Sequence, residues 1–138
     1  MRIMALDLGT KTIGVALSDA TGLIARGLET IRRGRIESDF SRLAKIIADN
    51  EVKKIVIGYP KNMNGTIGER AQFCEDFADK VKERFPDLEV LLWDERLSTV
   101  AAEKVLISAD LRRDKRKKII DMMAAVVILQ NYLDSRKK

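Results

Sequence analysis

The sequence predicts an α/β fold built on a mixed five-stranded sheet that is flanked by helices. Its first part holds three strand-like apolar segments separated by turns of a few residues, which is typical of an antiparallel meander. Strand-like and helical patterns then alternate, which is typical of β-α units. With 138 residues, 46% of them hydrophobic and 34% charged, the chain can bury a real core. It shows no internal repeat and no linker, so we expect one domain over residues 1–138.

The opening meander is predicted from apolar runs that are bounded by short turns. The connection between the first two strands is too short for a crossover, so the pair should be an antiparallel hairpin. Gly27 interrupts the third segment and indicates a bulge or a bend there. In chain order the sequence predicts strand 2–8, turn 9–11, strand 12–17, turn 18–22 and strand 23–31.

The remainder of the chain alternates between helical and strand-like periods. Ser38 or Asp39 can cap a helix that continues to about residue 50. The pattern Thr66–Glu69 fits a capping box for a second helix that continues to about residue 85. The predicted inward faces of these helices hold Phe40, Leu43, Ile46, Ile47, Phe73, Phe77 and Val81. The other predictions are strand 54–58, turn-rich loop 59–65, strand 88–93, a helix capped by Ser98 or Thr99 to about 108, polar segment 109–116 and helix 117–133.

Acidic residues stand at three places where the pattern calls for hydrocarbon. Asp7 lies inside the first apolar strand, Asp94 and Glu95 end the last strand, and Asp121 lies on the inward face of the last helix. A carboxylate buried without a partner costs several kcal/mol, so it must be protonated, paired or bound to a metal. The side chains of Asp94 and Glu95 point in opposite directions along a strand, so only one of them is needed in a site shared with the other acids. Together the acids suggest one shared site for a hard divalent cation.

Each acid also has a purely structural interpretation. Asp7 could form a buried salt bridge, for instance with Arg96. Asp121 could accept a hydrogen bond from a backbone N–H or pair with an arginine, and Asp94 or Glu95 could cap a helix or lie on the surface. In favour of a site, small residues on the face of Asp7 would leave room for a metal or a phosphate.

Composition narrows the chemistry further. The chain has no histidine and one cysteine, which excludes imidazole acid–base catalysis, His-liganded metals and a zinc–cysteine cluster. Oxygen ligands favour Mg²⁺ or Mn²⁺. The net charge is +5, and residues 112–118 hold six cations and one anion. Such a basic segment suits binding to a polyanion such as nucleic acid. The alternative is a solvated basic loop. No segment resembles a membrane span or a signal peptide, so we expect a cytoplasmic protein.

Five short motifs surround these acids, at residues 7–19, 58–66, 94–99, 118–125 and 128–133. They resemble the YqgF family, also called RuvX, whose members are described as pre-16S rRNA nucleases and Holliday-junction resolvases. The resemblance implies an RNase H-like fold, a bacterial cytoplasmic protein and processing of the 5′ end of 16S rRNA. It implies the catalytic and metal-binding acids Asp7, Glu95 and Asp121, with Asp94 as a rival to Glu95. Many RNase H-like nucleases place the second acid after the fourth strand, whereas here that strand is predicted to end at Gly58.

Contacts to nucleic acid are expected from turn residues and from cations. The turn-rich loop precedes a helix N-terminus, which is a natural anion site, although turn and cap chemistry alone explains its Asn, Gly and Thr residues. Arg96 could steady the scissile phosphate or neutralise Asp94, and the basic segment would grip the backbone without reading sequence. The predicted contact residues are Lys11, Thr12, Asn62, Asn64, Thr66, Arg96, Arg112, Arg113 and Lys115.

Several functions remain open at the level of sequence. Pre-rRNA is the favoured substrate and ribosomal particles are possible partners, while a resolvase would act on branched DNA and would need a symmetric homodimer rather than a monomer. A non-catalytic RNA-binding assembly factor would keep the basic clusters but would leave the acids without a purpose. The segment from Asp7 to Thr10 also resembles a phosphate motif of ATP-binding domains, but that group closes two such domains over its nucleotide.

Overall fold

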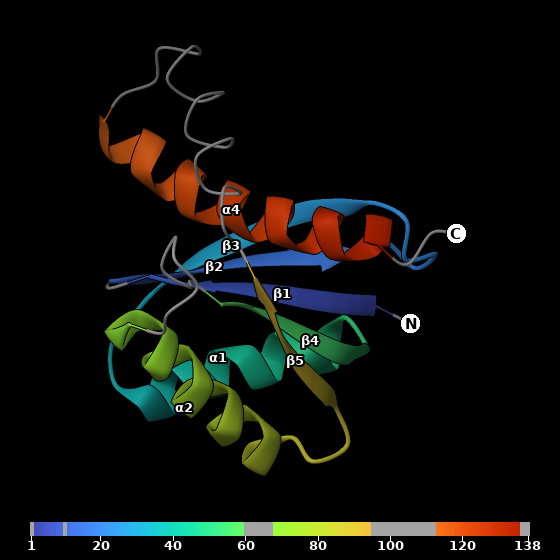
Figure 1. Cartoon of the computed structure of the whole chain (residues 1–138), viewed down its shortest axis with the longest axis horizontal. Helices are drawn as coiled ribbons and strands as arrows, with labels where there is room; N and C mark the ends of the chain where they lie inside the picture. The colour runs from blue at the N-terminus through green and yellow to red at the C-terminus, as the bar shows by residue number, and fades with distance from the viewer. Residues whose placement is uncertain (1, 10, 60–67, 95–112, 136–138) are drawn as a thin grey trace.

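The molecule has three layers, with a central sheet between helices on both faces (Figure 1). The structure, a computed structural model, describes residues 2–9, 11–59, 68–94 and 113–135, and their side chains except those of 113–121. Among these residues no helix combines the length and the apolar character that crossing a membrane requires. The elements are β1 (Arg2–Leu8), β2 (Thr12–Ser18), β3 (Ala25–Arg32), α1 (Ile36–Asp49), β4 (Val52–Tyr59), α2 (Glu69–Arg84), β5 (Glu89–Asp94) and α4 (Arg113–Ser135).

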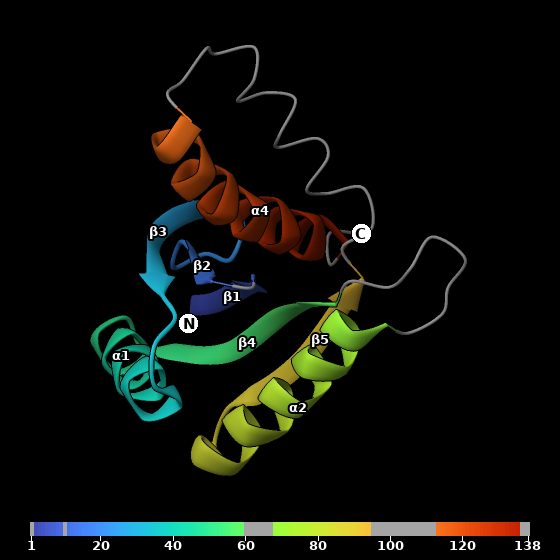
Figure 2. The same cartoon turned by 90° about the vertical axis from the view of Figure 1, so that its left-hand side faces the viewer.

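The sheet is mixed, with the strand order β3-β2-β1-β4-β5. β1 pairs antiparallel with β2, and β2 pairs antiparallel with β3, so the predicted meander is confirmed. β4 pairs parallel with both β1 and β5, as β-α crossovers require. Figure 2 shows α1 and α2 below the sheet and α4 above it. The predicted mixed five-stranded sheet flanked by helices is therefore confirmed.

The face that α1 and α2 cover is packed with large hydrocarbon side chains. Phe40 of α1 stacks on Phe77 of α2, with ring centroids 5.2 Å apart. These rings meet alternate residues of the central strands, which all point to this face because side chains alternate along a strand. The strand residues in this cluster are Met4, Leu6, Leu8, Ile13, Val15, Leu17, Ile31, Val52, Ile55, Ile57 and Tyr59.

The face that α4 covers is built from smaller residues. Ala5 of β1 and Ala16 of β2 lie under Ala125 of α4, which lets the helix approach the sheet closely. Gly27 of β3 marks the tightest point, because a Cβ placed there would lie 2.7 Å from Cγ and Sδ of Met122. A register shift occurs where Val15 pairs with Glu29 and Ala16 pairs with Gly27, so the bulge predicted at this glycine is confirmed.

A hydrogen-bonded turn between β2 and β3 anchors the far half of α4. Asp19 Oδ1 accepts hydrogen bonds from the backbone N–H groups of Leu23 (2.9 Å) and Ile24 (3.2 Å). Gln130 of α4 then spans the turn, since its Nε2 donates to Leu23 O (3.1 Å) and its Oε1 accepts from Ala25 N (2.9 Å). Because the amides of 23 and 24 are used by Asp19, β3 begins at Ala25, and the predicted start at 23 is wrong.

Helix starts differ from prediction. Helix α1 begins at Ile36 with Arg35 as its N-cap, so the predicted cap at Ser38 or Asp39 is wrong. Asp39 lies inside the first turn, where its Oδ1 accepts from Gly34 N at 3.3 Å. The N-cap of α2 is Gly68, which makes no side-chain cap, so the predicted capping box at Thr66–Glu69 is wrong.

Two other elements are longer than predicted. α4 begins at Arg113 rather than near 117, because Arg and Lys are good helix formers despite their charge. β4 runs from Val52 to Tyr59, one residue beyond the predicted end at Gly58. The helix predicted from residue 98 to about 108 lies outside the described residues.

Candidate active site

The candidate site lies where the three mutually parallel strands end. β1, β4 and β5 run in one direction, so their carboxyl ends share one edge of the sheet, which is where α/β sheets usually place their sites. Asp7 is next to last in β1 and only 8% exposed, as predicted. Asp94 is the last residue of β5 and is exposed, and it pairs with Tyr59 at the end of β4.

Asp7 lies on the α4 face, and a glycine stands level with it on each neighbouring strand. It alternates with Ile3 and Ala5, which belong to the cluster under α4. On one side its register partner is Gly14 of β2. On the other side β4 pairs Ile57 with Leu6, so the following residue, Gly58, stands level with Asp7. The neighbouring strands therefore place no side chain directly beside this buried carboxylate.

Asp94 occupies a register position on the other face. In β5 Leu91 and Trp93 pack with the cluster under α4, whereas Val90 and Leu92 pack with the cluster under α1 and α2. Strand alternation therefore groups Asp94 with the latter face and away from Asp7. Glu95 lies outside the described residues, so which of the two adjacent acids accompanies Asp7 stays a prediction.

The position of Asp121 follows from the backbone of α4. Ala124, Ala125 and Ile128 are buried, and they lie three, four and seven residues after Asp121, on the same side of the helix. Figure 1 shows the amino-terminal half of α4 on the same side of the molecule as the end of β1. The inward face predicted for this helix is thus confirmed for these three buried residues. The side chain of Asp121 lies outside the described ones.

The end of β4 is tied to α2 by a phenol. Tyr59 Oη donates a hydrogen bond to Glu75 Oε1 at 3.0 Å. Burial, followed by the hydrogen bond and the charge of Glu75, raises the pKa of Tyr59, so the phenol stays a protonated donor at neutral pH. This link ties the carboxyl end of β4, one residue after Gly58, to α2.

The donor set suits a hard cation, although only part of it is described. Carboxylate oxygens are the ligands that Mg²⁺ and Mn²⁺ prefer, and the chain holds no histidine to compete. Over the described side chains no group of three or more acids converges as a metal site. The predicted trio includes Glu95 and the side chain of Asp121, which both lie outside that described part, so the trio stays a prediction.

Two predicted nucleic-acid contacts lie in the turn that follows Asp7. Lys11 is exposed, and its carbonyl accepts from Arg33 N at 2.8 Å. Thr12 begins β2, and its carbonyl accepts from Gly9 N, also at 2.8 Å. The structure therefore brings both residues to the edge that carries Asp7. The other predicted contacts fall outside the described residues or side chains, namely Asn62, Asn64, Thr66, Arg96, Arg112, Arg113 and Lys115.

Sequence reasoning missed two arginines at the same edge. Arg33, which follows β3, donates from Nη1 to Gly9 O at 2.6 Å, and Arg70 in the first turn of α2 donates from Nη2 to Leu8 O at 3.2 Å. In the sequence Arg33 stands out only as one of four nearby arginines, with Arg26, Arg32 and Arg35. The signal that could have found Arg70 is its place just after a helix start that follows a parallel strand.

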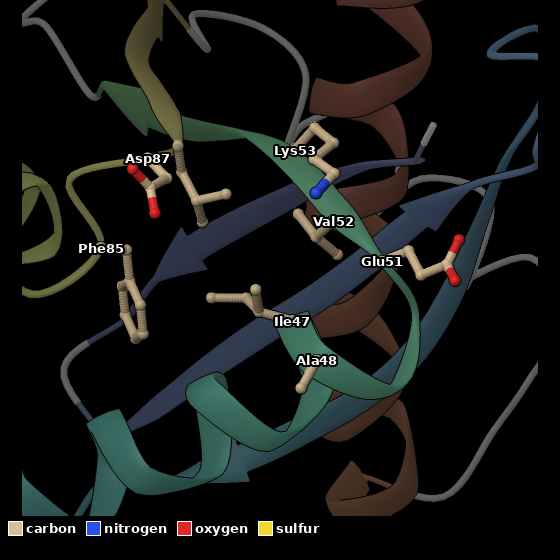
Figure 3. Close-up of a pocket in the computed structure, with 8 residues that line it drawn as sticks. Ile47, Ala48, Glu51, Val52, Lys53, Phe85 and Asp87 are labelled. Carbon is tan, nitrogen blue, oxygen red and sulfur yellow. The ribbon is translucent and has the colours of Figure 1, made fainter.

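A groove elsewhere on the molecule is not part of this site. It has a volume of ≈ 610 Å³ and lies at the amino ends of β4 and β5, the opposite edge from Asp7 (Figure 3). Ile47, Val52 and Phe85 line it, and its charged residues sit on an exposed rim. The described lining of this groove contains no buried carboxylate. Despite the size of the groove, the candidate site is therefore the carboxyl edge of the sheet.

Comparison with known proteins places the chain in a family. A relative from Desulforamulus reducens named "Putative pre-16S rRNA nuclease" is 62% identical over 138 residues, covering 100% of both chains. One of the same name from Bacillus subtilis is 59% identical, covering 98% of this chain and 99% of the relative.

Solved structures with the same fold include Thermus thermophilus RuvC in complex with a Holliday junction substrate, with a TM-score of 0.61 at 13% identity, covering 99% of this chain and 96% of that one. Fowlpox virus resolvase in complex with Holliday junction DNA gives a TM-score of 0.63 at 15% identity and covers 100% of both chains. The fold is therefore RNase H-like, as predicted. A family model described as "RuvX: Holliday junction resolvase" matches residues 1–135, and the chain belongs to this family.

Proposed function

We propose that this protein is a nuclease that hydrolyses phosphodiester bonds with the help of a divalent metal. The observation that carries the proposal is Asp7, a buried carboxylate in the central strand with glycines level with it on both neighbouring strands. Burial of such a group costs free energy, and glycines contribute no side-chain packing beside it. That combination is expected where a strand end is shaped around a ligand.

In the proposed mechanism the acids share one cation. Asp7, Glu95 and Asp121 would hold Mg²⁺ or Mn²⁺, which would activate a water molecule and offset charge that develops on the phosphoryl group. Asp7 is held rigidly by its place in the central strand, and α4 sets the depth of Asp121. Lys11 and Thr12, in the adjoining turn, would contact the phosphate backbone of the substrate.

The favoured substrate is precursor 16S rRNA, cut near its 5′ end in the cytoplasm. The names of relatives at 56–62% identity over almost the full chain support this choice. Ribosomal particles would then be the natural partner. A four-way DNA junction is the second candidate, supported by the family description and by the two resolvase complexes that share the fold.

A cleavage assay tests the proposal. Wild type and Asp7→Asn would be incubated with an RNA that spans the 5′ end of 16S rRNA and with a four-way DNA junction, each with Mg²⁺, Mn²⁺ or a chelator. We expect metal-dependent cutting by wild type that Asp7→Asn loses, with RNA preferred over the junction. Preference for the junction would move the substrate to DNA. If folded wild type binds RNA but cuts neither substrate, alone or with ribosomal particles, the protein is an assembly factor and the nuclease proposal fails.

A further inference from the structure

The turn after β1 is held from the α2 side by two arginines. Arg33 Nη1 donates to Gly9 O at 2.6 Å, and Arg70 Nη2 donates to Leu8 O at 3.2 Å. The two residues come from different parts of the chain, one after β3 and the other in the first turn of α2. Their guanidinium groups therefore meet at two consecutive carbonyls that immediately follow Asp7 in the sequence.

These arginines line a small pocket rather than a flat surface. The pocket has a volume of ≈ 180 Å³ and is lined by Leu8, Gly9, Arg33, Glu69, Arg70 and Phe73. Arg33 lies over the ring of Phe73, with Cζ 4.4 Å from the ring centroid. This stacking contact holds the guanidinium plane in place, so less conformational entropy is lost when a ligand binds to it.

The charges of the lining favour an anion with several acceptor oxygens. Two guanidinium groups and the Glu69 carboxylate give the lining a formal charge of +1. A guanidinium presents five N–H donors in a planar fork that matches phosphate geometry. The first turn of α2, which carries Arg70, adds partial positive charge.

The pocket lies close to the proposed catalytic acid but on the other side of the sheet edge. Gly9 is two residues from Asp7, a span of roughly 7 Å in extended chain. Asp7 lies on the α4 face, whereas Leu8 and Phe73 belong to the α1–α2 side. A single nucleic-acid strand that crosses the carboxyl edge could therefore touch both. We propose that Arg33 and Arg70 form a subsite for a non-scissile backbone phosphate of the substrate strand, a role that rests on the proposed nuclease function.

The competing explanation is that both arginines only brace the end of β1. A brace would affect stability and the placement of Asp7, but it would not change how binding depends on salt. A phosphate contact releases condensed counterions, which makes binding weaken as salt is added. Loss of one contact on a single strand therefore reduces the magnitude of the slope of log K against log salt concentration by about 0.7. The salt slope therefore separates the two roles.

Binding would be measured with a single-stranded RNA of about 12 nucleotides and with DNA of the same sequence, within the range of single-strand site sizes. All proteins would carry Asp7→Asn to prevent cleavage. The variants are Arg33→Gln, Arg70→Gln and Glu69→Gln. The control is Lys82→Gln, which removes an exposed cation from the same helix, 12 residues and about 18 Å beyond Arg70.

We expect each arginine variant to weaken binding to both strands by roughly tenfold, the scale of a charged hydrogen bond, and to lower the salt slope. Glu69→Gln should tighten binding several-fold, since it removes the anion from the lining, and Lys82→Gln should change neither quantity. If the arginine variants keep the wild-type slope, or if Lys82→Gln lowers it equally, the subsite is overturned.

The experiment separates the subsite from a folding defect of a variant and from failure of the nuclease proposal. If an arginine variant does not fold, Glu69→Gln still decides, because unchanged binding in that variant contradicts an anion in the pocket. If wild type cuts RNA while binding ignores the arginines, the subsite fails and the nuclease function stands. If wild type cuts nothing while binding depends on the arginines, the subsite stands as a nucleic-acid contact and the nuclease function fails.

Discussion

The two faces of the sheet differ in the side chains that they present. The face under α1 and α2 is filled with large aliphatic and aromatic groups, among them the stacked Phe40 and Phe77. The face under α4 has alanines and glycines at its centre and carries Asp7 at its edge. Large apolar groups contribute most of the burial free energy, whereas small ones let a helix come close and leave space for a ligand. The large apolar groups of the α1–α2 face therefore favour stability, whereas the buried acid lies on the face with the smaller residues.

The largest difference between the two faces is expected when one acidic charge is removed from each of them at the carboxyl edge of the sheet. We expect Asp7→Asn to lower the cleavage rate by at least about 10²-fold, the scale on which loss of a catalytic group acts. Asp94→Asn should change the rate by less than about threefold, since Asp94 belongs to the α1–α2 face. Single-turnover cleavage measures both. A large loss in Asp94→Asn would instead make Asp94 the second ligand in place of Glu95.

Stability should respond to the opposite face. Phe77→Ala removes a side chain that is 4% exposed and stacked on Phe40, so we expect a loss of about 3–5 kcal/mol in the free energy of unfolding. The melting temperature should fall by roughly 10 °C or more. Cleavage per folded molecule, measured well below that temperature, should stay close to wild type. A selective loss of cleavage there would show that the α1–α2 face also sets the geometry of the site.

The close approach of α4 can be tested at Gly27. A Cβ at this position would lie 2.7 Å from Met122 Cγ and Sδ, so Gly27→Ala should cost about 1–2 kcal/mol and should also slow cleavage by moving α4. Adding Met122→Ala should recover about 1 kcal/mol relative to additivity. Chemical unfolding of the double-mutant cycle measures this coupling.

Gly22→Ala is the matched control for that cycle. Gly22 has a φ of +74°, and a Cβ added there would meet nothing within 4 Å, so the cost of the substitution comes from backbone strain. Met122→Ala should therefore not rescue it. Equal rescue at both glycines would mean that the contact with α4 is not the cause.

The smallest effect concerns the turn that anchors α4. Hydrogen bonds from Thr21 and from the backbone of Leu23 lower the pKa of Asp19 from 3.8 to about 2. The contribution of this carboxylate to stability is therefore fully present above about pH 4 and is lost as the pH falls through about 2. Amide NMR signals of Leu23 and Ile24 should shift with a midpoint near that pKa. In Asp19→Asn this acid transition should be missing, and a transition that persists would assign it to another group.

Sequence predicted the order of the described elements and the buried acid, because both depend on local periodicity. Apolar runs placed every described strand within a few residues, and Asp7 stood out because it breaks such a run. Helix starts were less well predicted, since α1 and α2 have Arg35 and Gly68 as N-caps, and neither makes a side-chain cap hydrogen bond that a sequence motif would reveal. The register between strands is not local, so the glycines level with Asp7 could not be found beforehand. The same holds for Arg33 and Arg70, which converge only after folding.

The anchoring of α4 has a consequence for the order of folding. Gln130 bonds to Leu23 and Ala25, which lie 107 and 105 residues earlier in the chain. Such long loops close late, whereas the α1–α2 face can form from nearer segments. We expect a folding intermediate whose α1–α2 core is packed while α4 is undocked. In that intermediate Asp7 would be exposed and Asp121 would be remote, so the protein would acquire its catalytic competence only in the last step of folding.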